Sequence, residues 1–138
     1  MATRLNPYLN FSEGTRAAME FYRSVFGGEL TVSTFGEMPE MGLDESEKDK
    51  VMHSMLEVGP DLTLMAADVP SGMEMRPNGT LALTGDDEAR LRGWWDALCA
   101  DGTIGVPLEK APWGDSFGMC TDQFGVAWMV NIAGRPDQ

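Results

Sequence analysis

The sequence predicts an α+β fold of two βαβββ modules, which form a curved, cup-shaped mixed sheet with the helices on its outer face. Two observations lead to this prediction. Strand-like and helix-like apolar spacings alternate along the chain, and the same order of elements returns in its second half. At 138 residues the chain has the length of a single domain, 1–138. Within it we expect a first module at 5–68 and a second at 79–132.

The first helix is predicted over residues 12–28. Apolar residues recur there every four positions and form a broad stripe. Ser12 or Thr15 can cap the first turn, and the pair Gly27-Gly28 ends the helix because glycine accepts left-handed backbone angles. The stripe consists of Ala17, Ala18, Phe21, Tyr22, Val25 and Phe26.

The strands of the first half are short β-branched and aromatic runs separated by turn signals. The charged segment 36–50 also contains Met, Pro and Gly, so we expect an exposed loop with one helical turn. The strands are expected at 6–11, 29–35, 51–58 and 62–68.

After the turn-rich segment 69–79 the same order repeats, which indicates an internal duplication. A helix is expected at 86–102, with Asp86, Asp87 and Glu88 capping its start. Its apolar face predicts core or dimer contacts. Pro107 makes the weak strand 103–109 an edge or a bulge. The other strands are expected at 80–85, 116–122 and 126–132, and the apolar helix face consists of Leu91, Trp94, Trp95 and Leu98.

One helix per half can cover only one face of a four-stranded sheet, so the other face must meet a partner or line a cavity. Two halves side by side would enclose a concave cup, which suits a small organic ligand.

The formal net charge of −12 repels phosphate backbones and anionic lipids, so neither a nucleic-acid nor a membrane-surface partner is expected. No apolar run approaches the roughly 20 residues that span a bilayer, and the N-terminal residues lack a signal core. We therefore expect a cytoplasmic protein. Cys99 falls on a predicted helix and Cys120 on a predicted strand. The sequence allows two alternatives for them, two free thiols or a disulfide.

The stretches "FYRSVFGG" and "PWGDSFGMCTDQFGVAWMVN", with "PYLNF", "DKVMHSMLEV" and "LMAAD", resemble the PhnB-like branch of the vicinal oxygen chelate superfamily. This superfamily includes glyoxalase I, bleomycin-binding resistance proteins, fosfomycin-inactivating enzymes and extradiol dioxygenases. The resemblance covers roughly residues 5–132 and implies paired βαβββ modules and a homodimer.

Metal-dependent members place His and Glu ligands on the first and last strands of each module. By the resemblance these positions fall near Asn6, Met65, Thr80 and Met129, none of which is a strong ligand. We therefore expect no metal site and no cofactor, although a divalent metal held in another pattern stays open.

His53 is the only histidine, so sites with two or three histidines within one chain are excluded. Three interpretations remain: a metal ligand, a ligand-contacting or acid–base group in the cup, and a hydrogen-bonded structural residue. Glu57 cannot share an ion with it from the same strand, because four residues of strand span about 13 Å.

Three other side chains are candidates for the pocket. Asn10 and Asn131 end strands in corresponding places of the two halves and either aim amides into the cup or cap the strands. Trp113 begins the last hairpin and either roofs the cup or packs in the core. The strand methionines fill the core or line an adaptable pocket; they are Met52, Met55, Met65, Met119 and Met129.

These observations favour a small-molecule-binding protein of the glyoxalase/bleomycin resistance type, with Asn10, His53, Trp113 and Asn131 in its pocket. The alternative is an enzyme of lyase, isomerase, transferase or dioxygenase type that acts on a small metabolite or antibiotic. No catalytic residue is assigned by the sequence.

Overall fold

The computed structural model describes residues 6–37, 45–72 and 78–134. The chain divides into two compact units, 1–77 and 78–138, and each predicted module lies within one of them. Each unit is described by itself. No helix in the described part of the chain is long and apolar enough to cross a membrane.

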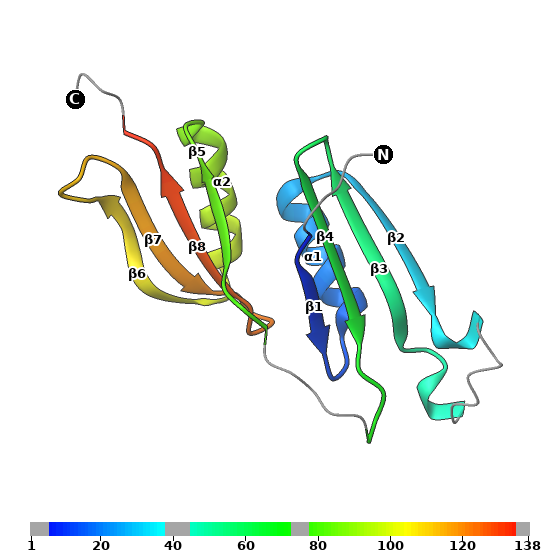
Figure 1. The fold of residues 1–138 in the computed structure, drawn as a ribbon. Coiled ribbons are helices and arrows are strands. Elements are labelled where there is room, and N and C mark those ends of the chain that lie inside the picture. Colours follow the sequence, from blue (N-terminus) through cyan, green and yellow to red (C-terminus); the bar gives the residue numbers. More distant parts are fainter. Residues whose placement is uncertain (1–5, 38–44, 73–77, 135–138) are drawn as a thin grey trace. The chain divides into compact units, whose positions relative to one another are not determined.

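The first unit has the predicted order β-α-β-β-β (Figure 1). Short 3-10 turns follow β2 at Phe35–Glu37 and precede β3 at Glu45–Glu47, so the helical turn expected within 36–50 is present. The elements are β1 (Tyr8–Phe11), α1 (Thr15–Phe26), β2 (Glu29–Thr34), β3 (Val51–Val58) and β4 (Leu62–Asp68).

The second unit repeats this order, which confirms the predicted fold class of two βαβββ modules. The register between β6 and β7 shifts twice, between Ile104 and Val106 and again before Glu109, so the bulge expected near Pro107 is present on an edge strand. The elements are β5 (Leu81–Gly85), α2 (Glu88–Cys99), β6 (Thr103–Lys110), β7 (Ser116–Thr121) and β8 (Ala127–Ile132).

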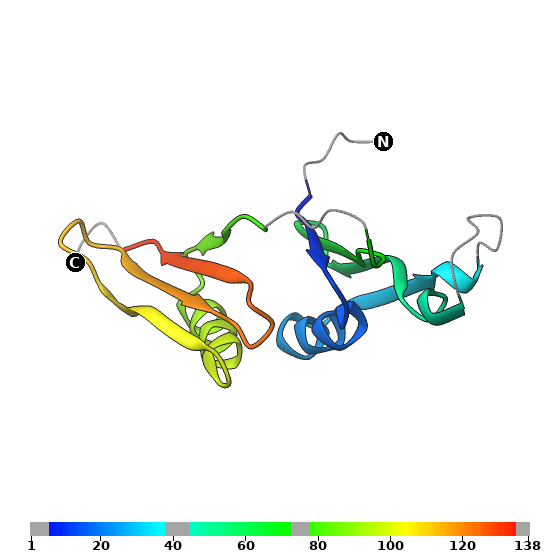
Figure 2. The same ribbon diagram turned by 90° about the horizontal axis from the view of Figure 1, so that it is seen from below.

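The two sheets have the same topology, with orders β1-β4-β3-β2 and β5-β8-β7-β6. In each, the first and last strands are parallel and the other pairs antiparallel. Each helix packs on one face of its own sheet (Figures 1 and 2). We call the opposite face, which its own helix does not cover, the open face.

Alternation along the strands decides which residues face each helix. In the first unit Leu9, Leu56, Leu64 and Ala66 are buried on the helix side, against Ala18, Tyr22 and Phe26 of α1. In the second unit Leu91, Trp95 and Leu98 of α2 are buried, as predicted for its apolar face. Trp94 is half-buried, and the Arg90 guanidinium lies 4.7 Å from its ring centroid.

The start of α1 is held by a residue far away in the sequence, which corrects the predicted cap. Gly14 is the N-cap and supplies no side chain. Instead, Oδ1 of the buried Asp68 accepts hydrogen bonds from the backbone N–H of Thr15 (3.0 Å) and from its hydroxyl (2.7 Å). Oδ2 of Asp68 accepts the Val51 N–H at 2.8 Å. One carboxylate thus joins the start of α1, the start of β3 and the end of β4.

A second buried carboxylate organises the hairpin between β7 and β8. Oδ1 of Asp122 accepts the N–H groups of Phe124 (2.8 Å) and Val126 (3.1 Å), and Oδ2 accepts the Trp128 indole N–H at 2.8 Å. The start of α2 has a local cap, because Asp87 accepts the Arg90 N–H at 3.1 Å, as expected for the acidic first turn.

We expect Asp68→Ala to lower the free energy of unfolding by about 3 kcal/mol, because it leaves three donors without their acceptor at a buried site. Urea unfolding followed by circular dichroism measures the change. Asp61→Ala, in the exposed turn between β3 and β4, is the control and should change stability by less than about 0.5 kcal/mol. Equal losses in the two variants would contradict the assigned role of Asp68.

Candidate functional site

The open face of the first sheet carries a row of side chains that crosses all four strands. Tyr8 pairs with Met65, Met65 with Met55, and Met55 with Thr31. His53 lies two residues before Met55 on β3 and therefore on the same face. The structure thus places His53 on the face away from α1, which the sequence alone left undecided.

His53 lies next to an aromatic neighbour on this face. The ring centroids of Tyr8 and His53 are 6.1 Å apart and their planes are inclined by 30°. Tyr8 is 46 % exposed, and the remaining burial raises the pKa of its hydroxyl. Asn10 shares the face of Tyr8, two residues further along β1. This face therefore offers an imidazole, a phenol, an amide and two thioethers.

The open face of the second sheet carries a matching row. Ala82 pairs with Met129, Met129 with Met119, and Met119 with Val106. Phe117 lies two residues before Met119, at the position that His53 occupies relative to Met55. Adjacent thioethers thus recur at equivalent positions in both modules, next to a ring on the same strand.

Trp113 lies in the turn between β6 and β7 and is 67 % exposed, so core packing of this side chain within its module is excluded. Its ring meets that of Phe117 edge-on, with centroids 6.4 Å apart. Each module thus has two neighbouring aromatic rings, of which only His53 and Phe117 occupy equivalent positions.

Asn131 lies on the open face of β8 and is held in place by Asp115. Its amide nitrogen donates to Oδ2 of Asp115 at 3.1 Å, and the Gly134 N–H donates to Oδ1 at 2.8 Å. These two donors, Gly134 first, lower the pKa of the Asp115 carboxyl. Besides this bond, the side-chain amide of Asn131 has a second N–H donor and an oxygen acceptor.

The register corrects the predicted correspondence between Asn10 and Asn131. Asn10 is on β1, paired with Ala67 of β4, whereas Asn131 is on β8, paired with Thr84 of β5. The counterpart of Asn10 is therefore Thr84, and that of Asn131 is Ala67. Asn10 and His53 lie in the first unit, Trp113 and Asn131 in the second.

Comparison with known proteins identifies the family. The sequence profile of the Glyoxalase/Bleomycin resistance protein/Dioxygenase superfamily matches residues 4–130. The chain belongs to this superfamily. Protein YjdN of Escherichia coli (strain K12) is 30 % identical, over 93 % of this chain and 94 % of that protein.

Solved structures agree with this superfamily assignment. Protein PA1353 from Pseudomonas aeruginosa is 36 % identical with a TM-score of 0.82, over 95 % of this chain and 98 % of that one. A PhnB protein from Bacillus cereus has the same fold, with a TM-score of 0.70 at 24 % identity over 95 % and 100 % of the two chains. The predicted resemblance is confirmed.

The residues at the superfamily's metal positions do not fit a divalent metal site. Met65 and Met129 occupy equivalent open-face positions, and the register makes Asn6 and Thr80 equivalent as well, two residues before Tyr8 and Ala82. Divalent transition metals prefer imidazole, thiolate and carboxylate ligands, and none of these four side chains supplies one. Among the described residues, no three His, Cys, Asp or Glu side chains gather in a group that could hold a metal.

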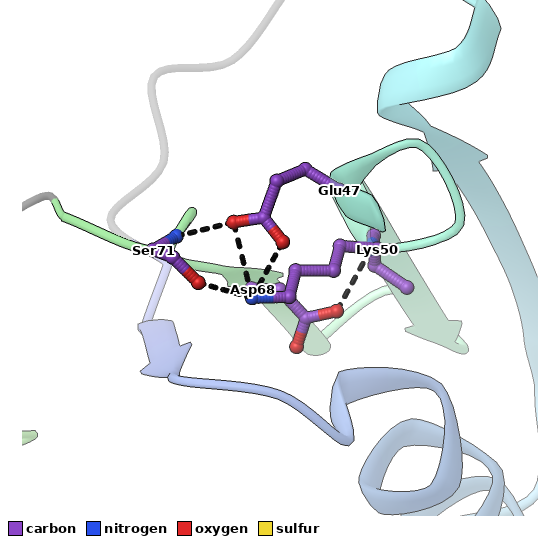
Figure 3. Close-up of polar contacts among 5 residues, drawn as sticks. Glu47, Lys50, Asp68 and Ser71 are labelled. Atoms are coloured by element: carbon purple, nitrogen blue, oxygen red, sulfur yellow. Dashed lines mark hydrogen bonds and ion pairs between the residues drawn. The ribbon is translucent and has the colours of Figure 1, made fainter. Parts of the chain in front are cut away.

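A polar cluster in the first unit was missed at the sequence level, because segment 36–50 was expected to be exposed. Glu47 is instead buried. Figure 3 shows its carboxylate in contact with Ser71 and Lys50. Its Oε1 accepts the Ser71 N–H at 2.5 Å, and its Oε2 lies 3.1 Å from the Lys50 ammonium. The Ser71 N–H, followed by Lys50, lowers the pKa of the Glu47 carboxyl.

Each unit also has a cavity away from its open face, near the start of its helix. The first is about 290 Å³ and lies beside the Glu47 cluster, lined by Ser12, Glu13, Lys50 and residues 69–72. The second is about 1150 Å³ and is lined by residues 86–89, Arg92, Lys110 and segments adjoining β7 and β8. Neither contains any of the four predicted pocket residues.

We expect Glu47→Gln to lower the melting temperature at pH 7, because the charged interaction with Lys50 is lost while an oxygen still faces Ser71. The folded-state pKa of Glu47 lies below its ordinary value of 4.5. Its stabilising effect is therefore complete above that value and disappears as the pH falls through the lower, folded-state pKa. Thermal unfolding from pH 7 to pH 3 should show the two curves converging in acid; a constant difference would contradict this assignment.

Proposed function

We propose that this protein binds a small organic molecule against its open sheet faces, which line the predicted cup. One observation supports this most directly. Both modules carry adjacent methionines at matching positions on the face that their own helix leaves uncovered, and the ring beside them, His53 or Phe117, lies close to a second aromatic ring in each module. Thioethers adapt to irregular shapes and make favourable contacts with aromatic rings, and aromatic side chains supply large contact areas.

The charges of the open faces select against anionic ligands. Glu29 and Glu57 face each other across β2 and β3, and Glu109 pairs with Phe117. Among the described strand residues, no lysine or arginine lies on either open face. We therefore propose a flat, neutral or cationic aromatic ligand; the candidate polar contacts are Asn10 and His53 on the first open face and Asn131 on the second.

A second candidate is an enzyme of the superfamily acting on a small metabolite or antibiotic. The observation that favours it is the position of His53 on the open face beside the Tyr8 ring. An imidazole exchanges protons near neutral pH and can act as acid or base toward a ligand on that face. Such a reaction would rest on His53 rather than on a metal at the family positions.

The cytoplasmic location and the homodimer belong to the same proposal. Both rest on the sequence-level expectations, and the dimer on the resemblance to the superfamily. Light scattering coupled to size exclusion distinguishes a dimer of about 30 kDa from a monomer of 15.1 kDa.

We expect tryptamine to raise the melting temperature more than indole-3-acetate, since the two probes share a ring but carry opposite charges. Calorimetric titration of tryptamine should show at least about threefold weaker binding in His53→Ala, Trp113→Ala or both, as each removes contact area or a polar contact.

Trp94→Phe is the matched control, because Trp94 lies on α2 under Arg90 and away from the open face of its sheet. It should bind tryptamine like the parent protein. Unchanged affinity in both His53→Ala and Trp113→Ala, or a preference for indole-3-acetate, would refute the proposed ligand class.

Metal analysis tests for a metal-dependent form of the second candidate. We expect no stoichiometric metal in the purified, tag-free protein and no thermal shift with Mn²⁺, Fe²⁺, Co²⁺, Ni²⁺ or Zn²⁺, because the family positions lack suitable ligands. A bound metal, or a shift that disappears in His53→Ala, would instead establish an enzyme with a rearranged site around His53.

A further inference from the structure

The two cysteines meet inside the second unit, on the opposite side of the sheet from the proposed ligand face. Cys99 is the last residue of α2 and is half-buried; Cys120 is on β7 and is 4 % exposed. Each thiol contributes to the pKa shift of the other, and both are free. These are the only two cysteines in the chain.

The backbone holds both cysteines in place. Cys120 is paired on both sides, with Ile104 of β6 and Trp128 of β8. The Gly102 N–H donates to the carbonyl of Cys99 at 3.0 Å, which turns the chain sharply at the end of α2. A Cβ at Gly102 would lie 2.3 Å from the Thr121 carbonyl oxygen, so only glycine allows this turn to approach β7 so closely.

We propose that Cys99 and Cys120 are an oxidation site, at which a peroxide closes a reversible disulfide between the end of α2 and β7. The Cys99 thiolate attacks one peroxide oxygen, the O–O bond breaks, and hydroxide leaves, which produces a sulfenic acid. The Cys120 sulfur then attacks the Cys99 sulfur and displaces the hydroxyl group as water. In total, two thiols lose two electrons and two protons, and one hydrogen peroxide becomes two waters.

Exposure decides the order of the two steps. Cys99 is the more accessible thiol and therefore reacts with peroxide first, whereas Cys120 is buried on β7 and would resolve the sulfenic acid. Burial raises the pKa of Cys99 and raises that of Cys120 to about 12. Since only the thiolate reacts, closure is slow at neutral pH and accelerates about tenfold per pH unit below the raised pKa of Cys99.

The test treats the full chain with hydrogen peroxide, alkylates it under denaturing conditions, and measures the intact mass. We expect a species 2 Da lighter that resists alkylation at both cysteines and reverts with dithiothreitol. The cross-link should raise the melting temperature by roughly 5 °C, and the closure rate should rise about tenfold from pH 7 to pH 8.

Two variants assign the steps. In Cys120→Ala, Cys99 should form a sulfenic acid that dimedone traps, because no resolving thiol remains; in Cys99→Ser, Cys120 should stay reduced and alkylatable. Two alkylatable cysteines in peroxide-treated wild type, an intermolecular dimer through Cys99, or a rate independent of pH would overturn the proposal. The wild-type mass measurement decides even where a variant fails to fold, and it does not depend on the proposed ligand.

Discussion

The buried carboxylate of Asp68 is the constraint on which the first module depends. It replaces the missing side-chain cap at Gly14 and also fixes the start of β3, so it sets the position of α1 on the sheet. Buried carboxylates are stable only when hydrogen bonds satisfy them, and three donors do so here. Once α1 is fixed on one face, the other face stays uncovered by the helix. In the second module, Asp122 holds the β7–β8 hairpin through three donors in the same manner.

The duplicated topology then explains both the likeness and the difference of the two open faces. The methionine pairs Met55–Met65 and Met119–Met129 occupy equivalent cross-strand positions, so the apolar floor is the same in both modules. The adjacent ring differs, because His53 stands where the second module has Phe117. The imidazole is therefore confined to the first module. The second offers a larger aromatic surface and the oriented amide of Asn131.

Sequence periodicity predicts the helices and strands here because the spacing of apolar residues depends only on residues close together in the sequence. The features that it missed depend on contacts between distant residues. The cap on Thr15 comes from a residue 53 positions later, and Glu47 is buried through its bond to Ser71, 24 positions later. The face of His53 also needed the register of β2 and β3, which shifts beside Ser33. A one-residue shift moves every side chain of a strand to the opposite face of the sheet. Near a bulge, the strand pairing is therefore needed to assign the face on which a residue lies.

The proposed function is supported most strongly by the methionines at the positions that the resemblance implies for metal ligands. Replacing a carboxylate or imidazole by a thioether removes affinity for divalent ions but preserves volume and adds a polarisable surface. Met65 and Met129 are each paired with a second methionine, so the thioether surface extends across two strands in each module. A thioether surface beside exposed aromatic rings fits a site that recognises a ligand by contact area, with chemistry, if any, left to His53.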